Sequence, residues 1–303
     1  MPAGEFVGGE EAPRAPARPA WSEFRRALEE RGFRPSRRLG QNFLRDGNMA
    51  RAIVRDARVL AGDFVLEVGP GCGFLTLHLA ALGARVLAIE IDPRLLEVAR
   101  ELLTPWPNVR FVLGDALAGK HALSPGLLDA LPRSGPWHVV SNLPYAAGTP
   151  ILALCARLPN PPASMTCLVQ RELAERITAS PGGREWGALA VRMQTAYLCE
   201  LVRPVPPDLF WPRPKVESSL LRLELREARP GAEELARLDG LLELLFRQRR
   251  KSVGGLLASR LGGREAAERL LGSLGIRPDA RPERLETESL LAIVRSPDWF
   301  ESA

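Results

Sequence analysis

Four consecutive residues in the middle of the chain combine groups suited to chemistry: Asn142, Leu143, Pro144 and Tyr145. They follow the apolar run 137–141, which predicts a buried strand. Asn and Pro both favour turns, so a turn that merely ends this strand is one interpretation. The other interpretation is a site that holds the amine of a nucleobase.

An exocyclic base amine is a poor nucleophile because its lone pair is delocalised into the ring. An Asn side-chain oxygen and a backbone carbonyl can each accept one N–H of the amine and favour a form with an available lone pair. Pro144 fixes the backbone and brings no competing N–H, while Tyr145 offers a ring on which a base can stack. Catalysis would then depend on positioning and desolvation, without a general base.

A glycine-rich turn begins the part of the chain that must position this site. The apolar run 64–68 predicts a buried strand, and the glycines Gly69, Gly71 and Gly73 follow it. A helical pattern then covers residues 74–82 and ends at Gly83. Strand, glycine turn and helix are typical of the first unit of a doubly wound parallel sheet, which binds ligands at the carboxyl ends of its strands.

The glycine spacing differs from the dinucleotide-binding pattern, because Phe74 stands where the third glycine of that pattern would be. Glu67 lies two residues before the first glycine, and a negative charge there disfavours a pyrophosphate. It suits a ligand that carries positive charge and no phosphate. S-adenosylmethionine, with its ammonium and sulfonium groups, has these properties.

Acidic residues follow the next two predicted strands. Run 85–89 ends at Glu90, whose carboxylate can accept both hydroxyls of a ribose. Run 109–113 ends at Gly114 and Asp115, which are placed to meet an adenine edge. A tight turn without any ligand is the alternative for the glycines alone, but acids after two successive strands favour a nucleoside cofactor.

The 303 residues suffice for one large domain and a smaller one, and a net charge of +5 allows an anionic partner such as nucleic acid. The four cysteines are widely spaced and the three histidines show no ligand spacing, so we expect reduced core thiols and no metal. Residues 1–20 lack the apolar core of a signal peptide and predict a disordered extension. No apolar run is long enough to span a membrane, so we expect a soluble, cytoplasmic protein.

Two basic regions could contact nucleic acid. Eight arginines and two aspartates lie between Arg31 and Arg58, among them Arg37 and Arg38. A solvated helix face and a phosphate-contacting face both explain this region. Residues 229–231 predict a linker, and leucine-rich helical segments follow at 233–250, 256–261, 264–274 and 286–295. In this helical domain Arg247, Arg249, Arg250 and Lys251 form a positive patch, for which we favour RNA docking over mere solvation.

Six motifs in order resemble those of the KsgA-type ribosomal RNA adenine N6,N6-dimethyltransferase family. They are residues 39–44, 67–73, 142–145, 169–176, 205–216 and 246–251. The resemblance implies a doubly wound, mostly parallel, seven-stranded α/β methyltransferase sheet over residues 21–228, with a small all-helical domain over 229–303. It implies that two methyl groups are transferred from S-adenosylmethionine to N6 of each of two adjacent adenosines near the 3′ end of small-subunit rRNA.

The resemblance also implies roles for individual residues. Phe210 would form an aromatic sandwich with Tyr145 around the target base. The cofactor would contact Gln41, Asn42, Leu44, Glu67, Gly69, Gly71, Gly73, Glu90, Ile91, Asp115, Ala116 and Asn142. The partner would be small-subunit rRNA in an assembling 30S-type particle, bound by a monomer without membrane or metal.

Two hypotheses compete with this one: a resistance-type methyltransferase of large-subunit RNA, and an assembly factor that does not retain the reaction. The C-terminal helical domain disfavours the first, and the intact Glu90, Asn142 and Tyr145 disfavour the second. Two stretches depart from the family pattern. Residues 146–150 are less polar than is usual, and Gly254 and Gly255 are expected to weaken a helix by about 1 kcal/mol each relative to alanine.

Overall fold

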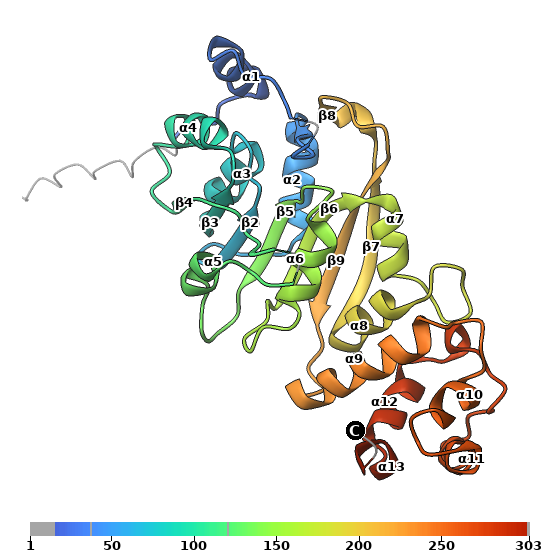
Figure 1. Cartoon of the computed structure of the whole chain (residues 1–303). Helices are drawn as coiled ribbons and strands as arrows, with labels where there is room; N and C mark the ends of the chain where they lie inside the picture. Colours follow the sequence, from blue (N-terminus) through green and yellow to red (C-terminus); the bar gives the residue numbers. More distant parts are fainter. Residues whose placement is uncertain (1–15, 37, 120, 302–303) are drawn as a thin grey trace, which may run out of the picture.

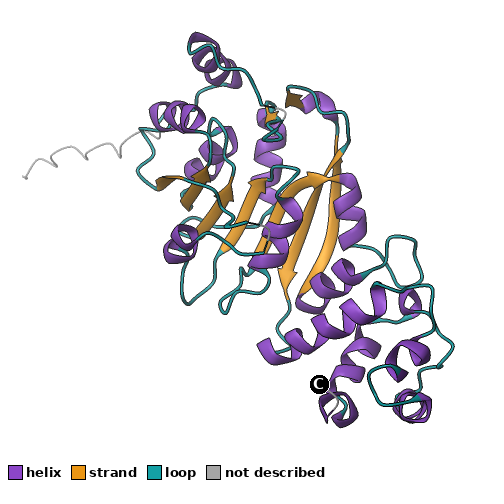
Figure 2. Ribbon diagram, viewed as in Figure 1, coloured by secondary structure: helices purple, strands orange, loops and turns teal. Residues whose placement is uncertain are grey.

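The computed structural model describes residues 16–36, 38–119 and 121–301. Most of the predicted disordered extension, and Arg37, therefore lie outside the described residues. A central sheet with helices on both faces forms the larger part of the molecule, and further helices gather at one end of it (Figures 1 and 2).

The sheet has seven strands in the order β4-β3-β2-β5-β6-β9-β7. All neighbours are parallel except β9, which is antiparallel to both β6 and β7. The doubly wound, mostly parallel sheet predicted from the sequence is thus confirmed. The strands are β2 (Phe64–Val68), β3 (Arg85–Glu90), β4 (Val109–Leu113), β5 (His138–Asn142), β6 (Ser164–Gln170), β7 (Tyr197–Val205) and β9 (Ser218–Leu225).

Alternate side chains of the buried strands enter two separate apolar cores, as the period of two in a strand requires. Val65, Val86 and Val140 face one core, which is covered by α1 (Trp21–Glu30), α2 (Gly47–Asp56), α3 (Phe74–Leu82) and α4 (Pro93–Leu102). Leu66, Leu87 and Val139 face the other, covered by α5 (Pro125–Ala130), α6 (Gly148–Cys155), α7 (Arg171–Ile177) and α8 (Ala188–Ala196). The Pro, Gly and Ser residues within 116–136 predict a loop there, and this prediction is wrong, because Pro125 begins α5 and Leu127 is buried in it.

A second, two-stranded sheet pairs β1 (Phe43–Leu44) with β8 (Phe210–Trp211). It joins the motif 39–44 to residues 205–216, a proline-rich loop that also contains the short helix η1 (Pro207–Leu209). The backbone N–H of Arg45 donates to the carbonyl of Leu209 at 2.9 Å. The rings of Phe43 and Trp211 stack with centroids 5.8 Å apart.

The C-terminal helices share a third core with the sheet domain. They are α9 (Ala232–Phe246), α10 (Val253–Ala258), α11 (Arg264–Ser273), η2 (Pro282–Arg284), α12 (Thr287–Arg295) and α13 (Pro297–Glu301). Trp186 before α8 and Val191 within it are buried among them, and the indole N–H of Trp186 donates to the carbonyl of Leu285 at 3.1 Å. The division at residue 228 therefore stays a prediction.

Two expectations about these helices need correction. Helix α9 ends at Phe246 rather than continuing to Arg250, and residues 247–250 form turns. Like charges one helical turn apart, such as Arg247 and Lys251, disfavour a longer helix. Gly254, expected only to weaken its helix, lies so close to Pro278 that a Cβ atom there would be 2.9 Å from the Pro278 carbonyl oxygen. It permits tight packing.

In the described part of the chain no helix is long and apolar enough to cross a membrane. Within the same residues, no group of three or more His, Cys, Asp or Glu side chains could hold a metal ion. All four cysteines are free thiols, and three of them are buried.

Candidate active site

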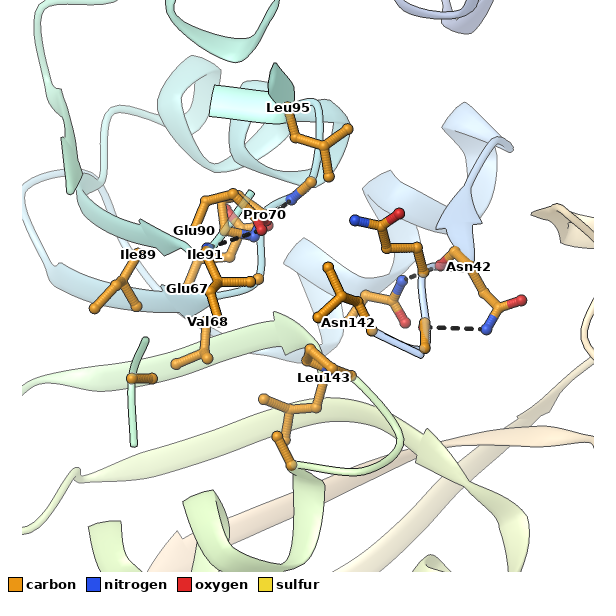
Figure 3. A pocket seen from close by; sticks show the side chains of 18 of the residues that line it. Asn42, Glu67, Val68, Pro70, Ile89, Glu90, Ile91, Leu95, Asn142 and Leu143 are labelled. Carbon is orange, nitrogen blue, oxygen red and sulfur yellow. Dashed lines mark hydrogen bonds between the residues drawn. The ribbon is translucent and has the colours of Figure 1, made fainter. Parts of the chain in front are cut away.

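A cavity of about 300 Å³ opens at the carboxyl ends of β2 to β5 (Figure 3). Its floor is the glycine turn after β2, one side is the β3–α4 turn, and the other is the segment 142–147 after β5. Residues 38–44 form a roof over it. The cavity thus gathers segments that are far apart in the sequence, at the edge of the sheet where ligands of such folds bind.

The glycine turn allows three segments to approach closely. Gly69 and Gly71 have φ angles of +69° and +61°, which other residues adopt only at a cost. A Cβ atom on Gly69 would lie 3.0 Å from the Pro144 side chain, and one on Gly71 would lie 2.8 Å from the Phe43 ring. These two glycines therefore allow both the motif 142–145 and the roof to lie against the turn.

Glu90 holds this turn in place. Its Oε2 accepts the backbone N–H of Gly71, and its Oε1 accepts those of Ile91 and Asp92, each at 2.9 Å. The side chain is almost fully buried, and burial raises its pKa. A carboxylate has about four lone pairs and three of them are used here, so Oε2 of Glu90 keeps one that can accept a hydroxyl group of a ligand. Acceptance of both ribose hydroxyls stays a prediction.

Glu67 behaves differently from expectation. It is 1% exposed, and its Oε2 has no hydrogen-bond partner among the described residues. Burial, reinforced by the nearby Glu90 carboxyl, raises the pKa of Glu67 from 4.5 to about 8. The negative charge inferred from the sequence is therefore neutralised by a proton at pH 7 in the protein alone. A cationic ligand beside it would favour the ionised form.

The roof is tied to the β3–α4 turn by a contact that the sequence did not predict. The Gln41 Nε2 donates to Oδ2 of Asp92 at 3.1 Å. Asp92 also pairs with Arg94 at 2.8 Å and caps α4, and the Arg94 hydrogen bonds lower the pKa of Asp92. Asp92 is thus a charged anchor for the roof. The sequence did offer one indication that Asp92 belongs to the site, because it lies only two residues after Glu90.

Asn142 is oriented by the roof. Its Nδ2 donates to the backbone carbonyl of Asn42 at 2.8 Å, drawn as a dashed line in Figure 3. The side-chain amide has one oxygen and one nitrogen, so this bond leaves Oδ1 as the group that can accept a hydrogen bond from the N–H of a substrate amine. Asn42 in turn donates from its own side chain to the Gly40 carbonyl at 3.1 Å. The acceptor required by the sequence hypothesis is present.

The remainder of the motif supplies a second acceptor and a ring. The Pro144 carbonyl accepts the N–H groups of Ala147 and Gly148, which lead into α6. No described residue donates to the Leu143 carbonyl, which directly follows Asn142, so this carbonyl is one backbone acceptor available at the motif. Tyr145 is half-buried on the cavity wall, and its hydroxyl lies 2.9 Å from the Ser218 hydroxyl. Burial raises the pKa of this phenol.

Phe210 is not brought to the cavity. It is 2% exposed, its ring packs in the first of the two sheet cores, and it is not one of the described residues that line the cavity. The sequence also allowed Trp211 to be an apolar anchor packed under the loop of residues 205–216, and in this arrangement Phe210 has that role. Its pairing with Tyr145 around a base remains a prediction, which requires the proline-rich loop to shift.

Most other predicted cofactor contacts do line the cavity: Gln41, Asn42, Leu44, Ile91, Asp115 and Ala116. Gly73 does not, because it begins α3 and packs on Ala99 and Leu103. Arg38 is exposed at the cavity mouth. The basic residues of the C-terminal helical region are exposed and do not line the cavity: Arg247, Arg249, Arg250 and Lys251.

A sequence model of the family described as ribosomal RNA adenine dimethylase matches residues 32–297. The chain is 43% identical over 269 residues to ribosomal RNA small subunit methyltransferase A of Phenylobacterium zucineum, covering 89% of this chain and 90% of the relative. It is 40% identical over 263 residues to the protein of the same name from Nitratidesulfovibrio vulgaris, covering 86% and 95%.

Two solved structures have similar folds. The crystal structure of the 23S rRNA methyltransferase ErmE has a TM-score of 0.66 at 31% identity, covering 83% of this chain and 98% of that one. A dimethyladenosine transferase from Plasmodium falciparum has a TM-score of 0.70 at 20% identity, covering 83% and 95%, and supports the fold alone.

Proposed function

The chain belongs to the ribosomal RNA adenine dimethylase family, and we propose that it transfers methyl groups to N6 of two adjacent adenosines near the 3′ end of small-subunit rRNA. It is an S-adenosylmethionine-dependent methyltransferase of ribosomal RNA. We further propose that it acts in the cytoplasm as a monomer, on an assembling 30S-type particle.

The residues around the cavity fit S-adenosylmethionine. Oε2 of Glu90 keeps a lone pair that would accept a ribose hydroxyl, Ile91 and Ala116 would offer apolar contacts to the adenine, and Asp115 would lie at its edge. Glu67 offers an unpaired, buried carboxyl to a positively charged group. When bound, the cofactor supplies an electrophilic methyl group.

The chain's own contribution is to present the amine. We propose that Asn142 Oδ1 and the Leu143 carbonyl each accept one N–H of the target N6 amine, which turns the nitrogen lone pair toward the methyl donor. Tyr145 would hold the base by stacking. No base of shifted pKa is needed, because the nitrogen can lose its proton after the transfer. The rate enhancement then comes from orientation and exclusion of water.

The observation that carries the proposal is the bond from Asn142 Nδ2 to the Asn42 carbonyl, since it fixes which end of the amide faces the substrate. The decisive experiment maps N6,N6-dimethyladenosine in small-subunit rRNA from cells with and without this gene. Purified protein should restore the modification to particles from the deficient cells. Methylation confined to large-subunit RNA would instead favour the activity named for ErmE.

The raised pKa of Glu67 predicts that cofactor binding releases a proton. Below pH 8 the empty site holds a protonated Glu67, and a cation favours the ionised form. Affinity for S-adenosylmethionine should therefore rise from pH 6 to 7.5, by up to about tenfold per pH unit. Calorimetry at pH 7 in buffers of different ionisation enthalpy should show close to one proton released.

Glu67→Gln is the control for this prediction, because glutamine keeps the shape of the side chain and cannot ionise. It should remove most of the proton release, and what remains is the titration of the cofactor's own amine. Equal proton release in the two proteins would show that Glu67 does not lose a proton when the cofactor binds.

The proposed docking role of Arg249, Arg250 and Lys251 predicts a change in salt dependence. Replacing all three by glutamine should weaken binding to small-subunit particles and reduce the slope of log affinity against log salt by about 0.7–0.9 for each phosphate that is no longer bound. Thermal stability should barely change, because the three side chains are exposed. A matched triple variant at the exposed Arg264, Arg269 and Arg277 should keep the wild-type slope. A lower melting temperature with an unchanged slope would indicate a packing role.

A further inference from the structure

A second cavity, of about 580 Å³, lies at the opposite edge of the sheet from the cofactor site. Its walls are α2, the turn after α2 and the end of α3, with Arg18 from the segment before α1. Leu60 precedes β2, and Leu82 ends α3, so this cavity is at the amino ends of the strands. Nothing in the proposed reaction uses it.

Four arginines line this cavity: Arg18, Arg51, Arg55 and Arg58. Arg55 pairs with Asp56 at 3.8 Å, and Arg58 with Glu224 at 3.6 Å. Both acids are shared with arginines that do not line the cavity, because Asp56 also pairs with Arg203 at 2.6 Å and Glu224 with Arg222. The cavity therefore keeps an excess of positive charge.

His78 is the least expected residue in the wall. It is 7% exposed, and neither ring nitrogen has a hydrogen-bond partner among the described residues. Burial, with the charges of Arg18 and Arg51, lowers its pKa to about 4. A neutral imidazole carries one N–H donor, and leaving it buried and unpaired is costly. An anion in the cavity would give that donor an acceptor.

Apolar groups lie beside the charges. Leu60 is 68% exposed and Leu82 is 38% exposed, and both line the cavity with the arginines. A small inorganic anion would leave these leucines in water. A nucleotide offers a phosphate for the arginines and a base or ribose for the leucines, and arginine is well suited to phosphate.

We propose that this cavity is a second RNA-binding site, which holds a phosphate and its attached nucleoside from the RNA substrate, away from the reacting adenosine. The proposal rests on the function proposed above, because it takes the ligand to be part of the same RNA. It gives α2 a role in substrate binding, in addition to its role in the core.

The first experiment measures binding of the Arg51→Gln/Arg55→Gln double variant to small-subunit particles whose rRNA lacks N6,N6-dimethyladenosine. The slope of log affinity against log salt should fall by about 0.7–0.9 for each phosphate that the variant no longer binds. The KM for particles should rise by a larger factor than kcat falls. The matched control is Arg264→Gln/Arg269→Gln on α11, which removes two exposed arginines that each pair with one glutamate.

A wild-type salt slope and KM in the Arg51→Gln/Arg55→Gln variant would overturn the proposal. This failure is distinguishable from failure of the proposed function, because the wild-type protein would still methylate the same particles. If the wild-type protein does not methylate them, the function itself fails.

A second measurement observes the cavity directly. The chain has three histidines, so His78 can be assigned in an imidazole NMR spectrum by comparison with His78→Gln. Adding a short single-stranded RNA should shift the His78 signal and raise the pKa of His78, while the signals of His121 and His138 keep their positions. An unchanged His78 signal at saturating RNA would overturn the proposal.

A third arm tests another occupant, the chain's own first fifteen residues, which contain Glu5, Glu10 and Glu11. The double substitution is repeated in a chain that begins at residue 16. If it still reduces the salt slope, the arginines contact RNA. If its effect disappears, the arginines act by binding the acidic segment, and the proposal is wrong.

Arg58 offers a variant in which charge and stability change in opposite directions. Its φ of +55° is a left-handed conformation, which is strained for a residue other than glycine. Arg58→Gly should therefore raise the melting temperature while it weakens RNA binding. Unchanged RNA binding in this more stable protein would remove Arg58 from the site.

Discussion

Asn142→Ala should lower the single-turnover rate of methyl transfer by about 10²–10³-fold, the usual cost of removing one positioned hydrogen-bonding group from a transition state. The substitution removes the Oδ1 acceptor for the target amine and also the bond to the Asn42 carbonyl. Affinity for the RNA particle should stay within about twofold of wild type, because Asn142 acts on one amine and not on the RNA backbone. Rates at saturating particle and cofactor concentrations provide the measurement.

Ser141→Ala is the matched control. Ser141 is the preceding residue, and its buried hydroxyl donates to the Val68 carbonyl at 2.6 Å. Removing that bond should reduce stability by about 1 kcal/mol and leave the transfer rate nearly unchanged. A transfer rate in Asn142→Ala within threefold of wild type would exclude Asn142 from the mechanism.

Glu90→Gln should weaken S-adenosylmethionine binding by about 1.5–3 kcal/mol, or roughly 10- to 100-fold. Glutamine keeps the shape of the side chain and one acceptor oxygen, but its NH₂ group only donates, so at that position neither the Gly71 N–H nor a ribose hydroxyl has an acceptor. This variant is preferable to Glu90→Ala, which would leave the N–H groups of Gly71, Ile91 and Asp92 without their acceptor.

Calorimetric titration with the cofactor measures this effect. Glu97→Gln on the exposed side of α4 removes a carboxylate from the same region and should bind the cofactor normally. Should Glu90→Gln also bind with wild-type affinity, the carboxylate would have only a structural role in the glycine turn.

The sheet and the cavity floor were predictable because each depends on a continuous stretch of sequence. Apolar runs give strands β2 to β5, and the glycines need their positive φ angles wherever the chain turns so tightly. The Asn142 motif follows a strand directly, so its place at the carboxyl edge follows from the topology alone.

The roof was not predictable in the same way. Strands β1 and β8 have two residues each, too few to show a period, and they lie far apart in the chain. The Gln41–Asp92 and Asn142–Asn42 contacts likewise join segments whose meeting depends on tertiary packing. The resemblance identified residues 39–44 as cofactor contacts, but it did not indicate that Gln41 bonds to Asp92 or that the Asn42 carbonyl accepts from Asn142.

Charge and burial at single residues were the least predictable. Glu67 was expected to be ionised, but its protonation depends on the almost complete removal of water around it. Phe210 was expected to face a base, whereas pairing of β8 with β1 places its ring in the core. Both outcomes depend on neighbours that the local sequence does not contain.

The shared core around Trp186 has a consequence for how the protein unfolds. Trp186 and Val191 belong to the sheet domain by sequence, yet they are buried against helices that begin at Ala232. A chain cut before α9 would expose this apolar face and favour aggregation. RNA docking and catalysis are proposed for separate regions, but the shared core is expected to couple their unfolding. A destabilising substitution in the C-terminal helices should therefore also lower the population of intact active sites.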